Sequence, residues 1–404
     1  MDFRLEYIAM TPGMKRQCLL AITAALGLAF AGPADAGGPA DGIADRFNTV
    51  FRQTVNDKNI TGVAFAVVTR ERIIRIGTAG HTDNSRAQAI NENTVFRVAS
   101  VSKTFAAGLS AVLVEEGEFD WNDRVVDYLP DFRVAGDASQ VRIQHLLGQS
   151  TGLIPHAYDN LIEDGVPVER IRKQFSQLEF LCPPGDCYSY QNSIFSLIEP
   201  VIEKTTERSY AQLMNDKIFA PLDMRDSSVG YEPFISNPNH ARPHVKSRGQ
   251  WRTVAVKPNY SHVAAAAGVN ASVLDMGKWL MAQLGSNPDV LTPEAINTVT
   301  EPRVYTARDK RRKYWRDIIS DAHYGLGWRI YKIGNEQIAY HSGWVSGYRA
   351  DIAWSQSHQV GLAVLMNVES SEISALSTTF WQMAFEQLPA QENGAHDVAL
   401  NASP

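Results

Sequence analysis

The stretch "GVAFAVVTRERIIRIGTAG", residues 62–80, decides the fold. It holds two runs of β-branched and small apolar residues on either side of the polar triplet Arg70-Glu71-Arg72, a pattern that predicts a β-hairpin. An isolated hairpin is marginally stable in water, so these two strands need partners from elsewhere in the chain.

Suitable partners lie near the other end of the chain. Four further β-rich runs follow one another there: "GWRIYKI" (327–333), "EQIAYH" (336–341), "GYRADIAW" (347–354) and "QVGLAVLMN" (359–367). Amphipathic helices are predicted over roughly 41–57 and from Ile373 to Leu388, one at each end of the chain. We therefore predict an α+β fold in which one antiparallel sheet is built from the N- and C-terminal segments and flanked by helices.

Between the two β-rich blocks the periodicity is mostly helical. The predicted helices cover residues 101–116, 141–148, 167–178, 193–204 and 272–284. We expect a single catalytic domain over residues 37–390, with an α/β part (37–100 and 265–390) and a mostly helical part (101–264). A cleft between the sheet edge and the helical part is a natural place for a binding site.

Composition and charge exclude several classes of function. The chain has 404 residues, of which 44% are hydrophobic and 20% charged, and its formal net charge is -6. This is the profile of a soluble globular protein, and it gives no reason to expect nucleic acid as a partner. The basic run "RDKRRKYWR", residues 308–316, is either a solvated loop or a site that recognises an anionic substrate.

The N-terminus predicts export. Lys15 and Arg16 precede an apolar run, residues 19–31, and Ala34-Asp35-Ala36 has the form of a signal-peptidase site. We expect a signal peptide over residues 1–36, with Met14 as an alternative start, and a periplasmic or secreted protein. The apolar run is too short for a stable membrane span.

The chain ends in a polar tail, and it has two closely spaced cysteines near its middle. The polar segment 391–404 is expected to be a disordered tail. Cys182 and Cys187 flank a Pro-Pro-Gly turn, and in an oxidising compartment they could form a disulfide. The sequence leaves this open, because so short a loop demands a specific geometry.

The first chemical motif is "SVSKTF", residues 100–105. Residues three apart share a face of a helix, so Ser100 and Lys103 are predicted neighbours, whereas Ser102 points elsewhere. A buried lysine that has lost part of its affinity for a proton can act as the base for a serine nucleophile. Ser-x-x-Lys alone is a weak signal, because a chain of this composition contains it about once by chance.

The second motif is Tyr190-Gln191-Asn192, which stands between "CPPGDCYS" and a helical pattern. A tyrosine with a nearby amide can take up and return protons beside a lysine. A second Tyr-x-Asn triplet, Tyr158-Asp159-Asn160, lacks this loop-to-helix context, so we prefer Tyr190.

The third motif is His341-Ser342-Gly343, expected at the end of the strand "EQIAYH". A small residue here would let a substrate lie along the strand and bond to its backbone. The backbone N–H of Trp344 could then join that of Ser100 in an oxyanion hole.

The ordered combination of the three motifs resembles the serine β-lactamase and penicillin-recognising superfamily. It is similar to the class C β-lactamase branch, with its D-alanyl-D-alanine carboxypeptidase and esterase relatives, over roughly residues 43–368. Three further stretches look like their counterparts in that branch: "IQHLLGQSTGL" (143–153), "DMGKWL" (275–280) and "YGLGWRI" (324–330).

The resemblance implies a role for each motif. Ser100 would be the nucleophile that forms an acyl-enzyme, Lys103 its proton acceptor, and Tyr190 the group that relays the proton to the leaving group. The coupled titrations of Lys103 and Tyr190 leave the division of the base role open. Asn192 would bond the substrate amide and hold Lys103.

His341 and Ser342 would line the pocket for an anionic or polar end of the substrate. The resemblance also implies that no cofactor or metal is needed and that the substrate is a small molecule or peptide. The sequence does not reveal the oligomeric state, and we expect a monomer.

One departure from the resemblance leaves the substrate open. Class C β-lactamases usually have Lys-Thr-Gly where this chain has His-Ser-Gly, and a histidine is only partly charged at neutral pH. We expect a β-lactam or D-alanyl peptide amide as substrate. A carboxylesterase of the same fold and a non-catalytic penicillin-binding or sensor module are the alternatives. Trp344 is bulkier than expected at its place and is predicted to narrow the pocket.

Other designs fit the sequence less well. "GQSTG", residues 148–152, has the form of an α/β-hydrolase elbow with Ser150 as nucleophile, but the segment before it reads as a short helix where an elbow needs a strand. His240 and His244 are four apart, but Pro243 predicts a loop between them, which argues against a metal site.

Overall fold

The computed structural model describes residues 38–390. The predicted signal peptide (1–36) and disordered tail (391–404) lie outside the described residues.

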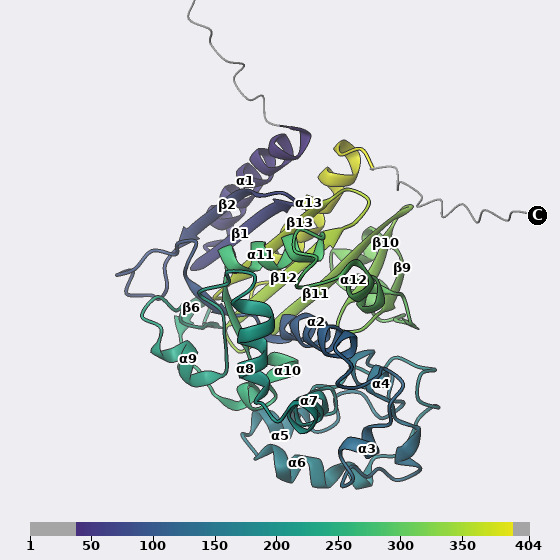
Figure 1. Cartoon of the computed structure of the whole chain (residues 1–404). Helices are drawn as coiled ribbons and strands as arrows, with labels where there is room; N and C mark the ends of the chain where they lie inside the picture. The colour runs from purple at the N-terminus through teal and green to yellow at the C-terminus, as the bar shows by residue number, and fades with distance from the viewer. Residues whose placement is uncertain (1–37, 391–404) are drawn as a thin grey trace, which may run out of the picture. The chain divides into compact units, whose positions relative to one another are not determined.

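The main sheet is antiparallel and has eight strands in the order β2-β1-β13-β12-β11-β10-β9-β8 (Figure 1). Its strands are β1 (Gly62–Thr69), β2 (Ile73–Gly80), β8 (Val304–Tyr305), β9 (Ile319–Tyr324), β10 (Arg329–Ile333), β11 (Glu336–Val345), β12 (Tyr348–Ser355) and β13 (Val360–Met366). The predicted hairpin and the four predicted late strands are all present, and the assembly of one sheet from both ends of the chain is confirmed.

The ends of the chain meet where β1 pairs with β13. Their register runs from Val63 opposite Met366 to Thr69 opposite Val360. Both strands are buried along almost their whole length, which explains why their sequences are continuously apolar rather than alternating.

Two terminal helices, α1 (Pro39–Lys58) and α13 (Glu372–Gln387), cover one face of the sheet (Figure 1). Helix α1 begins with Pro39 in its first turn and ends before Asn59, which adopts a left-handed conformation with φ 51°. On the inner side of these helices Phe47 makes edge-to-face contacts with Phe65 of β1 and with Phe380 of α13. Both terminal helices are confirmed within two residues of their predicted bounds.

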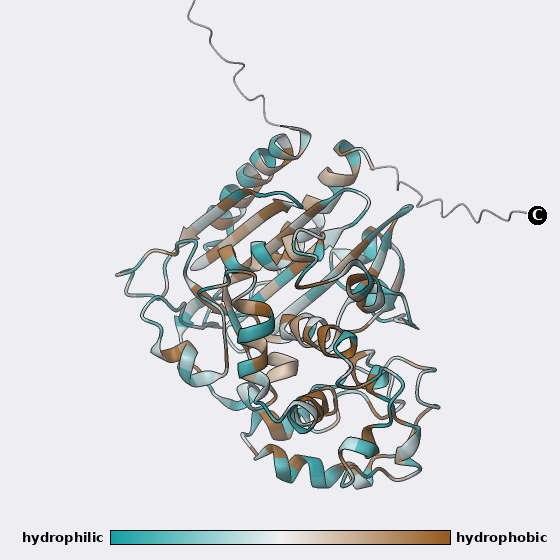
Figure 2. Cartoon of the chain, viewed as in Figure 1, coloured by the Kyte–Doolittle hydropathy of each residue, from teal (hydrophilic) through white to brown (hydrophobic). Residues whose placement is uncertain are grey.

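The opposite face packs against α11 (Val273–Gln283) and the mostly helical part of the chain. The most buried helix of this helical part is α2 (Ser102–Glu115), which is covered on nearly all sides. Figure 2 shows apolar residues along its length. The remaining α-helices are α3 (Val125–Tyr128), α4 (Ile143–Leu147), α5 (Asp159–Glu163), α6 (Val168–Gln174), α7 (Ile198–Thr206), α8 (Tyr210–Met214), α9 (Tyr231–Ser236), α10 (Ala264–Ala267) and α12 (Pro293–Thr300).

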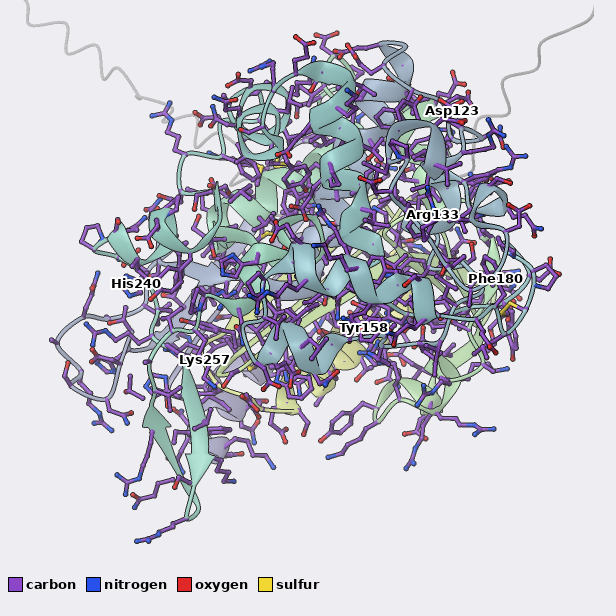
Figure 3. The ribbon with its side chains drawn as sticks, turned by 90° about the horizontal axis from the view of Figure 1, so that it is seen from below. Asp123, Arg133, Tyr158, Phe180, His240 and Lys257 are labelled. Atoms are coloured by element: carbon purple, nitrogen blue, oxygen red, sulfur yellow. A yellow bond between two sulfur atoms is a disulfide. The ribbon has the colours of Figure 1, made fainter. Side chains whose placement is uncertain are left out.

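Strands β8 and β9 of the main sheet were not predicted, and neither were several strands of two to four residues outside it. The strands outside it are β3 (Val95–Arg97), β4 (Ser228–Val229) and β7 (Val269–Ser272), which form a small sheet, and the hairpin of β5 (His244–Ser247) and β6 (Gln250–Thr253). Figure 3 shows His240 and Lys257, which precede and follow this hairpin in the chain, on the same side of the protein. These strands are two to four residues long, too short for a pattern of period two to be recognised.

Strand β11 is longer than expected. The His-Ser-Gly motif was placed at the end of a strand, but β11 continues through it to Val345. Its neighbour β10 pairs with β11 only as far as Tyr340, whereas β12 pairs with it from Ala339 to Val345. One backbone edge of residues 341–345 is therefore unpaired by any strand within residues 38–390.

Candidate active site

Ser100 lies in a single turn of 3₁₀ helix, Ala99–Val101, directly before α2. Lys103, in the first turn of α2, brings its Nζ to 3.5 Å from the Ser100 Oγ. The Ser102 side chain points away from this pair, because its Oγ accepts a hydrogen bond of 2.9 Å from the backbone N–H of Val269. The structure thus pairs Ser100, and not Ser102, with the lysine.

Lys103 is completely buried. Its Nζ lies 2.7 Å from Asn192 Oδ1, 3.0 Å from the carbonyl oxygen of Ala266 and 4.7 Å from the centre of the Tyr190 ring. Burial lowers the pKa of Lys103, while Tyr190 and the Asp159 carboxylate act in the opposite direction to a smaller extent. A neutral amine, able to accept a proton, is therefore favoured at a lower pH than in a free lysine.

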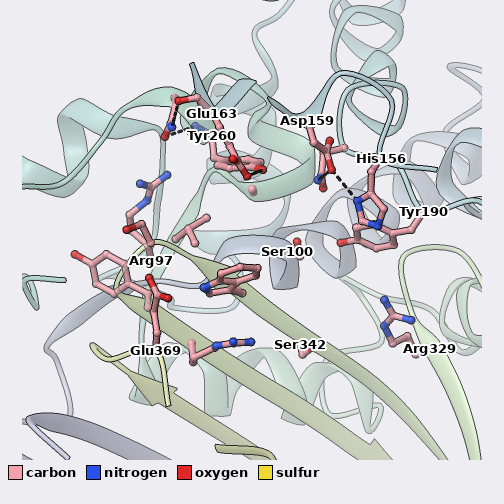
Figure 4. A pocket seen from close by; sticks show the side chains of 18 of the residues that line it. Arg97, Ser100, His156, Asp159, Glu163, Tyr190, Tyr260, Arg329, Ser342 and Glu369 are labelled. Carbon is pink, nitrogen blue, oxygen red and sulfur yellow. Dashed lines mark hydrogen bonds and ion pairs between the residues drawn. The ribbon is translucent and has the colours of Figure 1, made fainter. Parts of the chain in front are cut away.

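Tyr190 and Asn192 lie on the loop that leads into α7, and a polar network holds this loop (Figure 4). Asn192 Nδ2 donates to Asp159 Oδ2 over 3.0 Å, and the same oxygen lies 2.9 Å from His156 Nδ1. The backbone N–H of His156 donates to the carbonyl of Tyr190 over 2.8 Å. Asp159, part of the rejected Tyr-x-Asn triplet, thus supports Asn192 from the other side of the loop.

Gln149 holds the middle of the same loop, and the sequence analysis did not single it out. Its side-chain amide donates to the Gln191 carbonyl over 3.0 Å and accepts from the Gln191 N–H over 2.7 Å. Its own carbonyl accepts from the Ser189 N–H over 2.7 Å. The signal in the sequence was the stretch "IQHLLGQSTGL", which contains Gln149 and resembles its counterpart in the class C branch.

The two cysteines before Tyr190 form a disulfide, Cys182–Cys187. The chain around the disulfide bonds to the segment after α4. The N–H of Leu181, directly before the loop, donates to the Gly152 carbonyl, and the N–H of Gly185 within the loop donates to the Ser150 carbonyl, each over 2.7 Å. The disulfide therefore braces the chain directly before Tyr190.

Gly343 brings β11 against the turn that carries Ser100. A Cβ atom at this position would lie 2.0 Å from the carbonyl oxygen of Val98 and 3.2 Å from the Cβ of Ala99. No larger residue fits without separating the strand from the turn. Ala99 itself has φ 50°, a left-handed conformation that an alanine rarely adopts.

His341 lies on the same face of β11 as Gly343, since side chains alternate along a strand. It is fully buried, and its Nε2 lies 3.1 Å from the hydroxyl of Tyr324. Burial, together with the nearby Arg329 and Lys103, holds the pKa of His341 well below its usual range. His341 was expected to line the pocket beside Ser342, but the structure places only Ser342 on the cavity wall.

Two of the basic side chains that line the cavity, Arg312 and Arg329, lie close to Ser342 and Tyr190. Arg329 of β10 forms an ion pair with Asp309, and its guanidinium lies 5.4 Å from the centre of the Tyr190 ring. Arg312 donates to Ser342 Oγ over 2.8 Å. Arg312 and Asp309 belong to the basic run 308–316, so part of that run is built into the site rather than being a solvated loop.

These groups surround one cavity of about 700 Å³. Figure 4 shows Ser100 near its centre, with Tyr190 and Arg329 to one side and Arg97 and Glu369 to the other. Its lining includes Ser100, Tyr190 and Asn192 together with Ser342 and Trp344. Lys103, His341 and Gly343 lie behind this wall.

The alternative sites do not assemble. Ser150 follows helix α4 rather than a strand, and it is buried away from the cavity. His244 is bonded to the Asn367 carbonyl and to Thr253 Oγ1, each over 3.0 Å. Residues 38–390 contain no cluster of three or more His, Cys, Asp or Glu side chains arranged to hold a metal ion. In the same range, every helix is too short or too polar to cross a membrane.

Comparison with known sequences finds a protein family and several related proteins that this chain is similar to. The profile of the Beta-lactamase family matches residues 47–379. The chain is 26% identical to "Unguisins hydrolase ungD'" of Aspergillus campestris over 362 residues, which cover 85% of this chain and 64% of that protein. It is 25% identical to "Beta-lactamase" of Escherichia coli K12 over 313 residues, covering 78% and 75% of the two chains. The chain thus spans somewhat less than two thirds of the length of the fungal relative.

Comparison with solved structures supports the same fold. The octameric penicillin-binding protein homologue from Pyrococcus abyssi superposes with a TM-score of 0.73, at 21% sequence identity, over 85% of this chain and 79% of that chain. The octameric assembly is a property of the archaeal protein. For this chain, a monomer stays a prediction.

Proposed function

Because this chain belongs to the Beta-lactamase family, we propose that it is a serine hydrolase that cleaves its substrate through an acyl-enzyme on Ser100. The observation that carries the proposal is the contact of Ser100 with a buried lysine, which is itself held by Asn192 beside Tyr190.

In the first step Ser100 Oγ attacks the carbonyl carbon of the substrate and its proton passes to the Lys103–Tyr190 pair. The burial that lowers the pKa of Lys103 supports this transfer, because the amine must be neutral to accept a proton. The tetrahedral intermediate then collapses. The bond to the leaving group breaks, and Tyr190 supplies the proton that the leaving group needs.

The negative oxygen of the intermediate requires donors, and the backbone N–H groups of Ser100 and Trp344 are proposed to provide them. The packing of Gly343 on Val98 and Ala99 supports this assignment, because it holds β11 against the nucleophile turn. The unpaired edge of residues 341–345 would bind the substrate as an added strand.

In the second step a water molecule attacks the acyl carbon and its proton passes to the same Lys103–Tyr190 pair. The pair then returns a proton to Ser100 Oγ as the bond between this oxygen and the acyl carbon breaks. The products are the free serine and a carboxylic acid. Asn192, anchored by Asp159, is proposed to bond the substrate amide while it holds Lys103.

For the substrate, we propose a β-lactam or a D-alanyl peptide amide, both of which carry a carboxylate. Arg312 bonded to Ser342, and Arg329 beside Tyr190, support an anionic group at the leaving-group side of the cavity. Because His341 is buried and uncharged, these arginines are the candidates for the cation that Lys-Thr-Gly supplies in class C enzymes.

A carboxylesterase is the second candidate. The observation that favours it is the same buried, neutral His341, which leaves the strand motif itself without the lysine charge typical of antibiotic hydrolases.

The nucleophile is tested by labelling with a fluorophosphonate probe. Wild type and Ser150→Ala are expected to be labelled, and Ser100→Ala is expected to lose all label. Labelling that survives Ser100→Ala, or is lost in Ser150→Ala, would assign the nucleophile elsewhere, and an unlabelled wild type would favour the non-catalytic alternative.

The substrate class is tested by turnover of nitrocefin, a short-chain p-nitrophenyl ester and an acyl-D-Ala-D-Ala peptide. Turnover of the peptide or of nitrocefin is expected, and it should fall on Arg312→Ala mainly through a higher KM. Hydrolysis of the ester alone would reject the anionic substrate in favour of the carboxylesterase.

Export is also proposed, with cleavage after Ala36. The Cys182–Cys187 disulfide supports it, since disulfides persist chiefly outside the reducing cytosol. Mass spectrometry of the N-terminus of protein isolated from its native host should find Gly37 first, and an uncleaved N-terminus would reject the proposal.

A further inference from the structure

The cavity has a second half on the side of Ser100 away from Tyr190. Since Tyr190 is proposed to protonate the leaving group, the leaving group must lie on the side of Tyr190 and Arg329. The acyl part of the substrate then faces the opposite half, where Figure 4 shows Arg97 and Glu369. What lines this half decides which acyl groups the enzyme accepts.

Trp344 is the prominent apolar surface of the cavity wall. Its exposed fraction is 58%, and among the large exposed apolar side chains of residues 38–390 it alone lines the cavity. It follows Ser342 along β11, away from the end that pairs with β10 beside Arg329. Its ring is therefore on the acyl side of the nucleophile.

A charged side chain lies against one face of the indole. The guanidinium of Arg349 lies 4.9 Å from the centre of the Trp344 ring, a cation–π contact. Arg349 is in turn attracted by the carboxylates of Asp351 and Glu369. Glu369 is fixed by a hydrogen bond of 2.7 Å from the N–H of Gly347. One face of the indole is thus occupied, and an exposed aromatic surface remains.

A second aromatic ring borders the same cavity. Tyr260 is fixed by a hydrogen bond of 3.1 Å from its hydroxyl to Glu163, and both residues line the cavity (Figure 4). Aromatic surfaces held at fixed positions bind flat rings well, because little freedom is lost when the ring is bound.

We propose that Trp344 is a specificity-determining residue that binds an aromatic ring in the acyl group of the substrate. The inference rests on the proposed acyl-enzyme mechanism and adds the chemistry of the acyl side to it. A ring attached close to the scissile carbonyl would cover the exposed indole, as in a phenylacetyl group, whereas an acetyl group is too small to reach it.

The test compares three p-nitrophenyl esters with the same leaving group: acetyl, cyclohexylacetyl and phenylacetyl. Each kcat/KM is divided by the rate of alkaline hydrolysis of the same ester, which removes differences in intrinsic reactivity. The wild type should prefer phenylacetyl over acetyl about tenfold or more, and over cyclohexylacetyl by a smaller factor, since one aromatic contact adds to simple burial.

Trp344→Ala should reduce the phenylacetyl-to-acetyl ratio to within about twofold, and Trp344→Phe should keep most of it. The matched control is Tyr305→Ala, which removes an exposed aromatic ring outside the cavity and should leave the ratio unchanged. A wild-type ratio near one, or a ratio that survives Trp344→Ala, overturns the inference while leaving the acyl-enzyme intact.

Failure of the proposed function gives a different result, namely no Ser100-dependent hydrolysis of these esters, of nitrocefin or of the acyl-D-Ala-D-Ala peptide. Calorimetric binding of phenylacetate and acetate to Ser100→Ala then decides the inference by itself. Tighter binding of phenylacetate that is lost in Ser100→Ala/Trp344→Ala supports it, and equal or undetectable binding of the two overturns it.

Discussion

Single side chains set the chemistry of this site through what they are bonded to. Lys103 is suited to accept a proton because it is buried, and Asn192 fixes its amine at 2.7 Å. Gln149 fixes the backbone of the loop that carries Tyr190 and Asn192. Substitutions of these residues should therefore change the reaction rate and its pH dependence, and not only the stability of the fold.

Gln149 is expected to be a positioning residue. Gln149→Ala removes both side-chain bonds to Gln191 and should lower kcat/KM by about 10- to 100-fold, since small displacements of catalytic groups are costly. Gln149→Asn keeps the amide and tolerates the φ of 53°, so it should retain more activity.

Steady-state hydrolysis and thermal unfolding, measured on the same preparations, check this prediction. Gln177→Ala, an exposed glutamine without such bonds, is the control. Equal activity of Gln149→Ala and Gln177→Ala would contradict the positioning role.

The pH dependence of acylation follows from Lys103. Because its pKa is lowered by burial, the base form appears at lower pH than for a free lysine, whose pKa is about 10.4. The rate of fluorophosphonate labelling of Ser100 should therefore rise with pH and level off at a lower pH than the pKa of a free lysine would give. A rise centred near the pKa of a free lysine would show that Lys103 is not the buried base.

Elements position these side chains relative to one another. Strand β11 lies against the nucleophile turn, and the loop after the disulfide brings Tyr190 and Asn192 to the start of α2. Neither β11 nor this loop is held in its position by its own residues alone, because each depends on a close contact with a segment far away in the sequence.

The contact of β11 with the nucleophile turn predicts the result of Gly343→Ala. The added Cβ would lie 2.0 Å from a backbone oxygen, so the strand must move away and the proposed oxyanion hole would open. Activity should fall by 100-fold or more, as for the loss of an oxyanion donor.

Gly42→Ala, in α1, is the matched control, because nothing lies within 4 Å of the added Cβ and alanine favours the helix. It should retain full activity. An active Gly343→Ala would mean that β11 need not lie so close to Ser100.

The disulfide predicts a sensitivity to reduction. A Cys182→Ser/Cys187→Ser variant should lose about 2 kcal/mol of unfolding free energy, the entropy of closing a short loop, together with part of its kcat. Urea unfolding and hydrolysis rates check both effects. Dithiothreitol should reproduce them in the wild type and change nothing in the variant, whereas a wild type unaffected by full reduction would contradict the bracing role.

The whole molecule depends on the pairing of its two ends. Strand β1 comes from the first third of the chain and β13 from the last part, and their helices α1 and α13 pack together over the sheet. The turn that carries Ser100 lies between this sheet and the helical part. Loss of the packing between α1 and α13 should therefore destabilise the entire fold.

Phe380→Ala tests this dependence. Phe380 is fully buried between Phe47 and Trp381, and its truncation should cost about 3–5 kcal/mol of unfolding free energy. Gln382→Ala, exposed on the same helix, should change it by less than about 0.5 kcal/mol. Chemical denaturation gives both values, and similar values for the two variants would contradict a shared core of the chain ends.

The sequence by itself determined the assembly of one sheet from both ends of the chain and the choice of Ser100 with Lys103 and of Tyr190 with Asn192. It did so because apolar runs, helical spacing and ordered motifs are local properties, and their combination matched a known family.

Only the tertiary structure decided which way the remaining side chains face. It buries His341 against Tyr324, brings Arg312 to Ser342, places Gln149 on the backbone of Gln191 and closes the disulfide. The first three are contacts between segments far apart in the sequence. The two cysteines are only five residues apart, but a loop that short closes only where the surrounding fold supplies the required geometry. Strand β11 continues past Gly343, so side chains alternate between its two faces along residues 341–345. This alternation places His341 behind the cavity wall and Trp344 on it, and no local pattern in the sequence predicts that result.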